Sequence, residues 1–537
     1  MIPVSNVWKS AQNALLLPEM FVEITYEITE PGLQEEAVAS GSNPEEFSNV
    51  EQIVSRVDKN SEKYAMLDYG CWGLDGSYGY LEENPNDPGY VYADYSESDS
   101  SMATYPTITI DFAKRHTAAI PGVIITWGDT FGVWAEDFRI SAYDGGGVIA
   151  QKTVVGNKSV VTSVALDMVN YSKITIEILK WSHPYQRPRC IDVFLGVKAV
   201  YGKNDLLGFE HERTTDLLSA TLPENKITFR LRNDDNRWNP DAPDGSIRYL
   251  YEQQEVRVRY GMDVGNSIEW INGGTFWISE WNTPTNGLEA NFTARDAVEF
   301  MIDRFTGPRE GSVYDLAVSA FEQADLTLLD SGEKRYVIDE SLKNITTNFA
   351  DDGSDYTIAE VLQMLAHLGC CVFYQDREGV VHIEPRNKKY SDYMIEPVIS
   401  YSHPEYELSK PLKGILVEYE PDRETVYIEV ASRGEVQEIS NPLIVSAEQA
   451  QRVGEAAREV LENRKVVSGS FRADLRLDTL DNIIVASKYA SNILCITNVK
   501  YSIDGGAFKG TYTGRVMSIA LDYAKVFSGE FYSGDIW

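Results

Sequence analysis

The sequence predicts a mainly β, multidomain protein, α+β overall, whose helices fall largely in its second half. Three observations predict this class. Residues that favour sheets are frequent, with 31 Tyr and 19 Phe among 537 residues. Short segments that alternate apolar and polar side chains recur along the chain, as half-buried strands do. The chain is longer than a single hydrophobic core usually supports, so several domains are expected.

The charge of the chain limits its partners. It has 82 Asp and Glu residues against 48 Lys and Arg, a formal net charge of −34. Because DNA binding is driven by Lys and Arg that displace counterions, this balance argues against a protein that grips nucleic acid. It suits a surface past which DNA slides without being held.

The sequence shows no targeting segment or disulfide framework. The five Cys residues have no CxxC spacing, which is typical of free thiols in a reducing cytosol. The N-terminus has no basic region followed by an apolar one, so no secretory signal is expected. No apolar run approaches the roughly 18–20 residues that span a bilayer, so we expect no membrane span.

The first 200 residues predict one short helix followed by strands. The helix is expected over 6–17, before Pro18, and a strand over 21–28, where apolar and polar residues alternate. Residues 33–60 are acidic and rich in Ser and Asn, which predicts a connector. Residues 61–199 predict one antiparallel sandwich, because short strands alternate there with Gly- and Asp-rich turns. Its clearest strands are 107–112, 122–127, 137–143 and 173–178.

Strands continue to about residue 305, and helix signals appear after it. Ser312 and Thr357 are expected to cap helices, the second with Glu360 in a capping box. That helix is expected to end at Gly369 and to pack on a hairpin over 371–383. The last part predicts β structure with one inserted helix that begins after Ser446, and a closing hairpin over 497–516.

Catalytic and metal-binding motifs are not found. The sequence has no HExxH, GxSxG, GxxxxGK[ST] or CxxC pattern, and its six His residues are scattered. Any carboxylate pair chosen from so many acidic residues would be arbitrary. We therefore predict no enzyme, no catalytic residue and no cofactor. The Asp- and Gly-rich loops of 61–199 leave open a structural Ca²⁺, but they single out no ligands.

Aromatic residues in the loops of 61–199 predict a carbohydrate-binding site. Sugars pack their apolar faces on aromatic rings while nearby polar groups bind the hydroxyls. A sandwich also needs aromatic residues in its core, and Trp127, at the end of an apolar strand, is expected to be one of them. The candidate sugar-binding residues are Trp72, Asp75, Tyr78, Trp134, Trp181, Tyr185 and Arg187.

Two sets of segments resemble known families. Residues 65–77, 107–112, 137–144, 180–189 and 192–196 are similar to discoidin-like, galactose-binding-type jelly rolls of the kind found in phage tail proteins. Residues 229–240, 255–261, 273–278 and 293–296 resemble the first domain of phage tail-hub proteins. Residues 358–385 resemble the small α/β domain of that family, and the C-terminal part, including 504–506 and 510–515, resembles its last β domain.

The resemblance implies a domain arrangement for nearly the whole chain. Residues 1–46 with 200–305 would form a first tube-like β-barrel, and 47–199 an inserted jelly-roll β-sandwich that projects outward. Residues 306–385 would form a small α/β domain, and 386–537 the C-terminal β domains with one inserted helix. Two barrels in each of three chains would make a pseudo-sixfold ring under a hexameric tail tube.

The function that the resemblance implies is a structural hub at a virion tail tip or baseplate, made in the bacterial host cytoplasm. A homotrimer would close the tail tube, anchor peripheral proteins and let DNA pass on ejection. Its partners would be a distal tail protein, tail-tube or tape-measure proteins, and receptor-binding or fibre proteins. The net charge predicts an acidic channel wall that repels phosphate.

Two other functions stay open at this point. The protein is an adhesin if the discoidin-like module binds a cell-surface glycan on the host. It is a tail-associated cell-wall hydrolase if some of its many carboxylates form an unrecognised catalytic pair.

Overall fold

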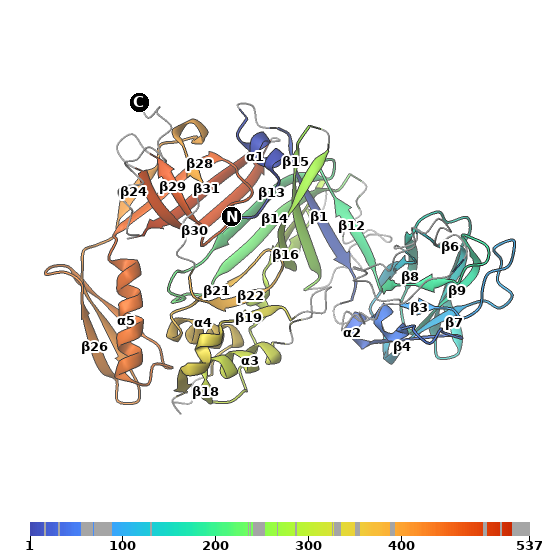
Figure 1. Cartoon of the computed structure of the whole chain (residues 1–537), viewed down its shortest axis with the longest axis horizontal. Helices are drawn as coiled ribbons and strands as arrows, with labels where there is room; N and C mark the ends of the chain where they lie inside the picture. Colours follow the sequence, from blue (N-terminus) through green and yellow to red (C-terminus); the bar gives the residue numbers. More distant parts are fainter. Residues whose placement is uncertain are drawn as a thin grey trace, which may run out of the picture.

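The computed structural model confirms the mainly β, multidomain class. It describes residues 1–537 except 15–17, 31–32, 55–67, 69–88, 129–131, 235, 237, 240–252, 266, 285–286, 325, 327–333, 350–354, 387–392, 487–490, 505–506 and 518–537. Figure 1 shows a large sheet in the upper part of the molecule, a β module at one end and a helix-backed sheet at the other. In the described part of the chain, no helix combines the length and the apolarity needed to cross a membrane.

A 13-stranded sheet, here called the joined sheet, organises the centre. Its main path runs through β12 (Val197–Tyr201), β1 (Met20–Ile28), β15 (Glu255–Asp263), β16 (Ile268–Asn282), β17 (Glu289–Arg295), β14 (Glu224–Arg232), β13 (Leu206–Thr214), β30 (Ser491–Asp504), β31 (Ala507–Val516), β28 (Lys465–Arg472) and β24 (Glu405–Leu408). Beside this path, β29 (Asn482–Ala486) pairs with β30, and β23 (Met394–Ile395) pairs with β29.

The joined sheet contains strands from both ends of the chain. β13 and β30 pair antiparallel from Phe209 opposite Ile503 to Thr214 opposite Asn498. Both strands bury their apolar side chains on one face, so the N-terminal and C-terminal sets share one core. The two strand sets that the resemblance assigns to two tube-like barrels are therefore joined edge to edge in one sheet.

The N-terminal helix closes one part of this core. α1 (Asn6–Gln12) begins after Ser5, whose hydroxyl accepts the N–H of Trp8 at 3.1 Å. The Trp8 ring is fully buried in the shared core. The helix is shorter than the predicted 6–17, because Asn13 ends it and residues 15–17 lie outside the described part.

The β module at one end of Figure 1 is a sandwich of two main sheets around its own core. The larger sheet has the order β2 (Ala37–Gly41), β4 (Thr107–His116), β9 (Tyr171–Trp181), β6 (Ala135–Asp144) and β7 (Gly147–Val154). The smaller has the order β11 (Asp192–Phe194), β5 (Ile120–Thr126) and β8 (Val161–Met168), and β3 (Tyr90–Val91) pairs with β10 (Arg189–Cys190). The short helices α2 (Leu33–Glu36) and η1 (Val50–Ile53) flank β2.

The predicted connector over 33–60 is wrong at its start. β2 pairs with β4 from Ala37 opposite Phe112 to Gly41 opposite Ile108, so it belongs to the sandwich. Its residues are Ala, Val, Ala, Ser and Gly, and such small side chains give little contrast between the faces of a strand. The sandwich therefore reaches back to residue 37, ahead of the expected boundary at 47.

The small α/β domain lies below the joined sheet in the view of Figure 1. Its helices are α3 (Val313–Gln323) and α4 (Ile358–Leu368), its main sheet has the order β19 (Tyr336–Ile338), β22 (Val381–Glu384) and β21 (Val372–Gln375), and β18 (Glu310–Ser312) pairs with β20 (Thr346–Asn348). The 3-10 helices η4 (Ala297–Phe300) and η5 (Glu340–Asn344) complete it. The predicted caps are confirmed: Ser312 accepts the N–H of Asp315, and Thr357 and Glu360 form a reciprocal capping box.

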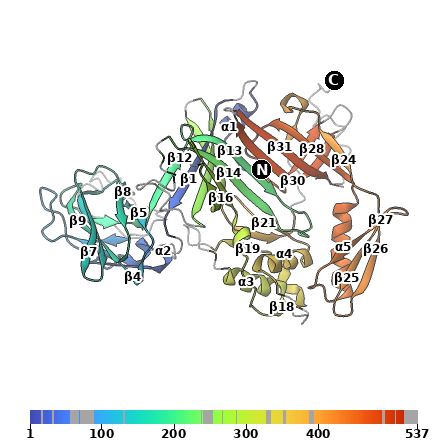
Figure 2. The same ribbon diagram turned by 180° about the vertical axis from the view of Figure 1, so that it is seen from behind.

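A helix-backed sheet, here called the end sheet, lies at the opposite end from the sandwich (Figures 1 and 2). It has the order β26 (Glu424–Glu429), β25 (Leu412–Tyr419) and β27 (Glu435–Ser440). α5 (Ala447–Leu461) begins after Ser446, as predicted, and packs on the face of the sheet that carries Ile415, Val417 and Ile428. η6 (Pro397–Ile399) and β24 connect this region to the joined sheet.

Candidate functional site: the polar face of the joined sheet

The joined sheet has one buried face and one polar face. In β14, Ile227, Phe229 and Leu231 are buried, whereas Lys226 and Arg230, in the alternate positions, are at least partly exposed. Cross-strand register carries this alternation from strand to strand, since opposite residues of paired strands share a face. Lys226 thus lies opposite Glu212 of β13, which lies opposite Lys500 of β30. The polar face is therefore continuous across the seam between the two sets of strands.

Basic and acidic side chains alternate in space on this face. The ion-paired basic residues are Lys198, Lys226, Arg230, Arg257, Arg259, Arg295 and Lys500, and their partners on the sheet are Glu23, Glu27, Glu210, Glu212, Glu224, Glu255 and Glu289. The two sets are equal in number. Each basic group is thus neutralised by a carboxylate on the same face.

The ion pairs have ordinary geometry, and all but those of the buried Glu27 and Glu255 join partly exposed side chains. Lys500 lies 2.6 Å from Glu210, and Lys198 lies 2.9 Å from Glu27. A hydrogen bond to Glu224 raises the pKa of Lys226. Partly exposed pairs of this kind contribute only about 0–1 kcal/mol each to stability. Their main effect is to cancel charge across the face.

The acidic channel wall that the net charge of −34 predicts stays a prediction. On the joined sheet, the residues that form these ion pairs are balanced in charge. Composition gives only the total charge, and cross-strand pairing decides where the charges cancel.

A buried ion cluster fixes the joined sheet to the α/β domain. Asp478 binds Arg213 of β13 and lies 3.0 Å from Nε of Arg377, in the turn between β21 and β22. Arg377 also donates to the carbonyl oxygens of Leu475 and Leu477 at 2.8 and 2.7 Å. Burial alone would raise the pKa of Asp478, but the two guanidinium groups outweigh it and lower that pKa. The cluster holds three distant parts of the chain in one arrangement.

His211 lies beside this cluster and is a core residue. It is fully buried, with Nε2 3.0 Å from Oδ1 of Asn225 and Nδ1 2.6 Å from the Tyr260 hydroxyl. The amide oxygen only accepts, so Nε2 donates and Nδ1 accepts from the tyrosine. Burial, reinforced by Arg213, lowers the pKa of His211 to about 3. The neutral ring serves packing, as expected for a histidine outside any motif.

The predicted sugar-binding residues have different positions. Trp72, Asp75 and Tyr78 lie outside the described residues. Trp181 is fully buried, with its ring centroid 6.3 Å from that of Trp127, so it offers no face to a ligand. Trp127 itself is buried in the sandwich core, which confirms the prediction for it.

Two of the candidates keep accessible surface at one end of the sandwich. Tyr185 is 51% exposed, and Trp134 is half-buried with its ring edge-on to His183 at 6.0 Å. Arg187 instead binds Glu45 at 2.9 Å and stacks on Tyr95. The exposed ring of Tyr95 was not predicted, because its loop of Ser, Glu and Asp residues gives no sign of a binding surface. Among the residues that the structure describes, no group of three His, Cys, Asp or Glu residues could hold a metal ion.

Comparisons with known proteins give structural matches alone. No protein-family model matches the chain, and no curated protein matches it. Thirty-six chains of solved structures do match. Three of these matches are described next.

A prophage MuSo2 43 kDa tail protein from Shewanella oneidensis is 12% identical, with a TM-score of 0.40, over 59% of this chain and 94% of that chain. A tail protein from Neisseria meningitidis is 8% identical, with a TM-score of 0.42, over 60% and 94%. A prophage tail protein from Listeria monocytogenes is 10% identical, with a TM-score of 0.38, over 62% and 95%. These proteins are of the class that the sequence resembles, although values this low do not carry a function across.

Proposed function

We propose that the chain is a structural hub of a phage tail tip or baseplate, in which three copies form a ring around a conduit lined by the polar face of the joined sheet. The observation that carries the proposal is the joined sheet itself. Two strand sets, from opposite ends of the chain, present one continuous polar face across a shared seam. Three such chains would supply six strand sets, one for each subunit of a hexameric tube. In this proposal the chain has a structural role and catalyses no reaction.

The ends of the joined sheet support ring closure. β12 and β24 end its main path, and each pairs on one side only among the described strands. Exposed apolar side chains lie on both strands: Val200 of β12 is 55% exposed, and Leu408 of β24 is 65% exposed. Unpaired strand edges are ready to pair with another chain. In the proposed ring, β24 of one subunit approaches β12 of the next.

The charge balance suits the passage of DNA. A wall with unpaired Lys and Arg would bind phosphate and release counterions, whereas a strongly acidic wall would repel the genome. Local pairing on the polar face avoids both effects. DNA would slide along such a wall with little attraction or repulsion.

The two end modules would serve attachment. The sandwich leaves the joined sheet after β1 and returns to it at β12, so it lies beside the sheet at its edge (Figure 2). In a ring built on the joined sheet, this position points away from the conduit. Distal tail, tube or tape-measure proteins would contact the rim, and receptor-binding or fibre proteins the outer modules.

Imaging of virus particles tests the proposal. A particle that carries an epitope-tagged chain should show the tag at the tail tip, and the averaged density should have threefold symmetry on the tube axis. The same chain, purified, should sediment as a trimer of 60.3 kDa subunits. A tag found along the tail shaft or in the capsid, or density without threefold symmetry, would contradict the hub.

A second candidate function is glycan binding by the sandwich, and the exposed ring of Tyr185 favours it. The loop of Tyr185 is held against the loop of Tyr95 by a bond from Tyr185 N–H to the Ser96 carbonyl at 3.1 Å. A glycan array with the full chain tests it, comparing Tyr185→Ala with Tyr105→Ala, whose side chain is also about half exposed. Binding lost in the first variant alone supports an adhesin, and no binding to any saccharide rejects it.

A further inference from the structure

The end sheet has a free edge at β27. β27 pairs with β25 on one side, and no described strand pairs with its other side. Glu435 donates its N–H toward β25, to the carbonyl oxygen of Pro411 at 2.8 Å. Because N–H groups alternate in direction along a strand, those of Val436 and Glu438 point away from β25. The edge therefore offers backbone donors to an added strand.

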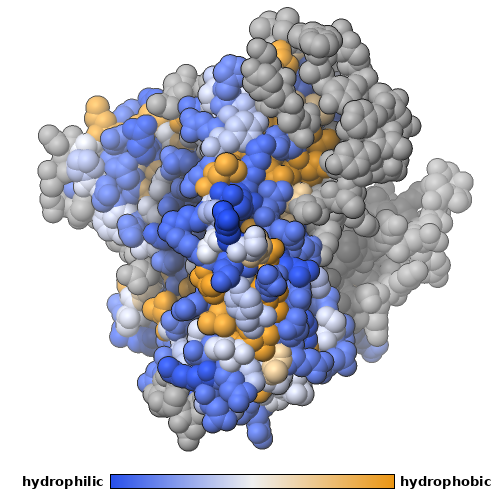
Figure 3. Space-filling model, turned by 90° about the vertical axis from the view of Figure 1, so that its left-hand side faces the viewer, coloured by the Kyte–Doolittle hydropathy of each residue, from blue (hydrophilic) through white to orange (hydrophobic). Residues whose placement is uncertain are grey.

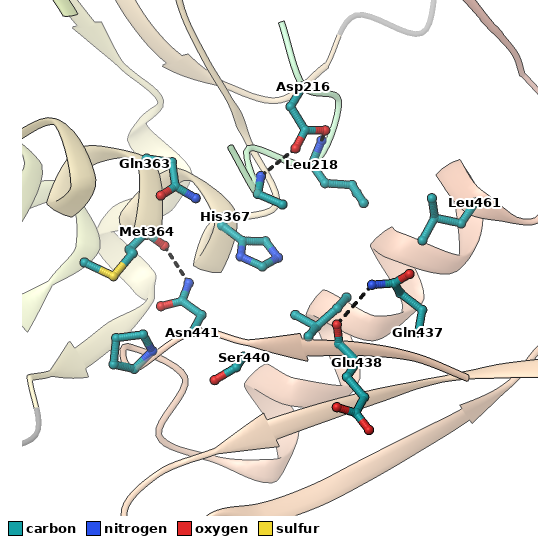
Figure 4. A pocket seen from close by; sticks show the side chains of 13 residues that line it. Asp216, Leu218, Gln363, Met364, His367, Gln437, Glu438, Ser440, Asn441 and Leu461 are labelled. Atoms are coloured by element: carbon teal, nitrogen blue, oxygen red, sulfur yellow. Dashed lines mark hydrogen bonds between the residues drawn. The ribbon is translucent and has the colours of Figure 1, made fainter. Parts of the chain in front are cut away.

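A side chain occupies the edge where a strand would bind. The carbonyl oxygen of Glu438 accepts the side-chain amide of Gln437 at 3.1 Å (Figure 4). Such a bond, from a neighbouring residue at the surface, exchanges readily for one from a backbone N–H. The edge carries no proline, and its single bulge lies in β25 rather than in β27. Proline and bulges, two common protections of edge strands, are thus absent from β27.

A pocket of about 500 Å³ opens beside this edge. It lies between β27, α4 and the turn after β13, and its apolar lining includes Leu218, Ile439 and Leu461. Figure 4 shows the His367 ring directed into it from α4. His367 is 6% exposed, and its Nε2 has no hydrogen-bond partner among the described residues. The pocket has both apolar and polar walls and one buried ring nitrogen without a partner among the described residues, which suits a side chain that is aromatic and ends in a hydroxyl.

The outer face of the end sheet is apolar and acidic. Tyr427 and Val436 are 46% and 43% exposed there, and register places Leu416 beside Tyr427. Glu429 and Glu438 share this face, and neither has an ion-pair partner in the described part of the chain. Figure 3 looks onto this end of the molecule and shows apolar surface running between polar groups. The uncompensated carboxylates favour a basic partner.

We infer that the free edge of β27 and the pocket beside it form a docking site for an extended, basic segment of a partner protein. The segment adds a fourth strand to the end sheet through the outward N–H and C=O groups of Val436 and Glu438. Its side chains alternate in direction, so Lys residues on one side meet Glu438, the carboxylate that the edge strand carries on the outer face. The other side enters the pocket, where a Tyr hydroxyl reaches Nε2 of His367. This site does not depend on the proposed ring.

A synthetic peptide tests the inference on the full chain. The probe is acetyl-Lys-Val-Lys-Tyr-Lys-Val-Lys-amide, and its counterpart has Glu in place of every Lys. Titration calorimetry should show binding of the Lys peptide and at least about tenfold weaker binding of the Glu peptide. Absence of binding by the Lys peptide, or equal binding of both, would overturn the inference.

Two substitutions separate the edge from the charge. Glu438→Pro removes an outward N–H, which proline tolerates at an edge, and should weaken the Lys peptide by about tenfold or more. Glu438→Lys keeps the N–H and should abolish the preference for the Lys peptide. Glu97→Lys, at an exposed position of the sandwich, is the matched control and should change neither value. Wild-type affinity in Glu438→Pro would refute strand addition, and an unchanged preference for the Lys peptide in Glu438→Lys would refute the charge contact.

A double-mutant cycle tests the pocket. The peptide with Phe in place of Tyr should bind the wild-type chain more weakly than the Tyr peptide does, because the hydroxyl contact is lost. In His367→Phe the two peptides should bind equally. A Tyr preference that survives this substitution would show that the side chain lies elsewhere.

Discussion

Individual buried charges connect parts of this protein that are far apart in sequence. Asp478 joins Arg213 and Arg377, which lie in β13 and in the turn of the α/β hairpin. None of the three belongs to a recognisable motif, because the arrangement exists only once the joined sheet has formed. Neither the cluster nor the buried position of His211 beside it could therefore be predicted from the sequence.

Removing the charge of Asp478 should destabilise the molecule. Asp478→Asn leaves two buried guanidinium groups without their carboxylate, which costs roughly 3–5 kcal/mol. In the wild type, the lowered pKa means that this stabilisation is complete above about pH 4 and is lost as the pH falls through the folded-state pKa. Urea unfolding at neutral and acidic pH measures both effects. Asp144→Asn, in a surface pair with Arg115, is the control and should change little.

Asp296 should make the stability of the fold depend on pH in the direction opposite to that of Asp478. Burial raises its pKa to about 7, and its Oδ2 has no hydrogen-bond partner among the described residues. The folded state therefore holds a proton that the unfolded chain releases near pH 4, so stability falls as the pH rises from about 4 to about 7. Asp296→Asn should remove this dependence and unfold at a higher temperature than the wild type at pH 8. Thermal melts at several pH values give the comparison, and parallel curves for the two proteins would contradict the assignment.

At the level of elements, the starts of helices could be predicted from signals local in the sequence, whereas the pairing of distant strands could not. The caps at Ser312, Thr357 and Ser446 lie where the sequence places them, since each depends on residues three positions apart. β2 was not predicted, because its small side chains make the alternation between apolar and polar positions hard to detect. The pairing of β13 with β30 could not be predicted from the sequence either. It joins strands almost 300 residues apart, and each alternates equally well as part of a separate barrel.

The edge strand β24 gives the proposed ring its sharpest test. Leu408 is 65% exposed on this edge, so Leu408→Asp should leave the thermal midpoint nearly unchanged. Placed against β12 of the next subunit, the carboxylate should weaken trimer assembly by about tenfold or more. Sedimentation velocity over a concentration series measures the assembly. Leu288→Asp, at a loop position 69% exposed, is the control. Equal weakening by both substitutions would argue against edge pairing.

For the molecule as a whole, the distribution of charge matters more than its total. A chain with a net charge of −34 has a large sheet face on which charges cancel in pairs, so the acidic excess lies elsewhere on its surface. That DNA is not gripped and that the channel wall is acidic stay predictions from composition. Composition does not show where charges cancel, because cancellation depends on which strands become neighbours.

Reversing charges on the polar face should turn a neutral wall into a binding surface. Glu210→Lys combined with Glu289→Lys removes the nearest carboxylate of Lys500 and the partner of Arg230, and adds two further cations. The variant should bind double-stranded DNA in a salt-dependent manner, whereas the wild type should not bind at about 150 mM salt. Fluorescence anisotropy with labelled DNA measures this. The control, Glu97→Lys combined with Glu136→Lys on the sandwich, should not bind DNA. DNA binding by this control would show that the added charges need not lie on the joined sheet.

The attachment of the sandwich bears on how such molecules diversify. β1 and β12 pair with Ile28 opposite Val197, so the chain departs and returns at adjacent points. Excising the intervening stretch and bridging the gap with a tight turn would leave an ordinary hairpin at the sheet border. Recombination can therefore exchange one outboard module for another, of any size, without rebuilding the scaffold. A gene built on this plan can change its attached module in a single genetic step.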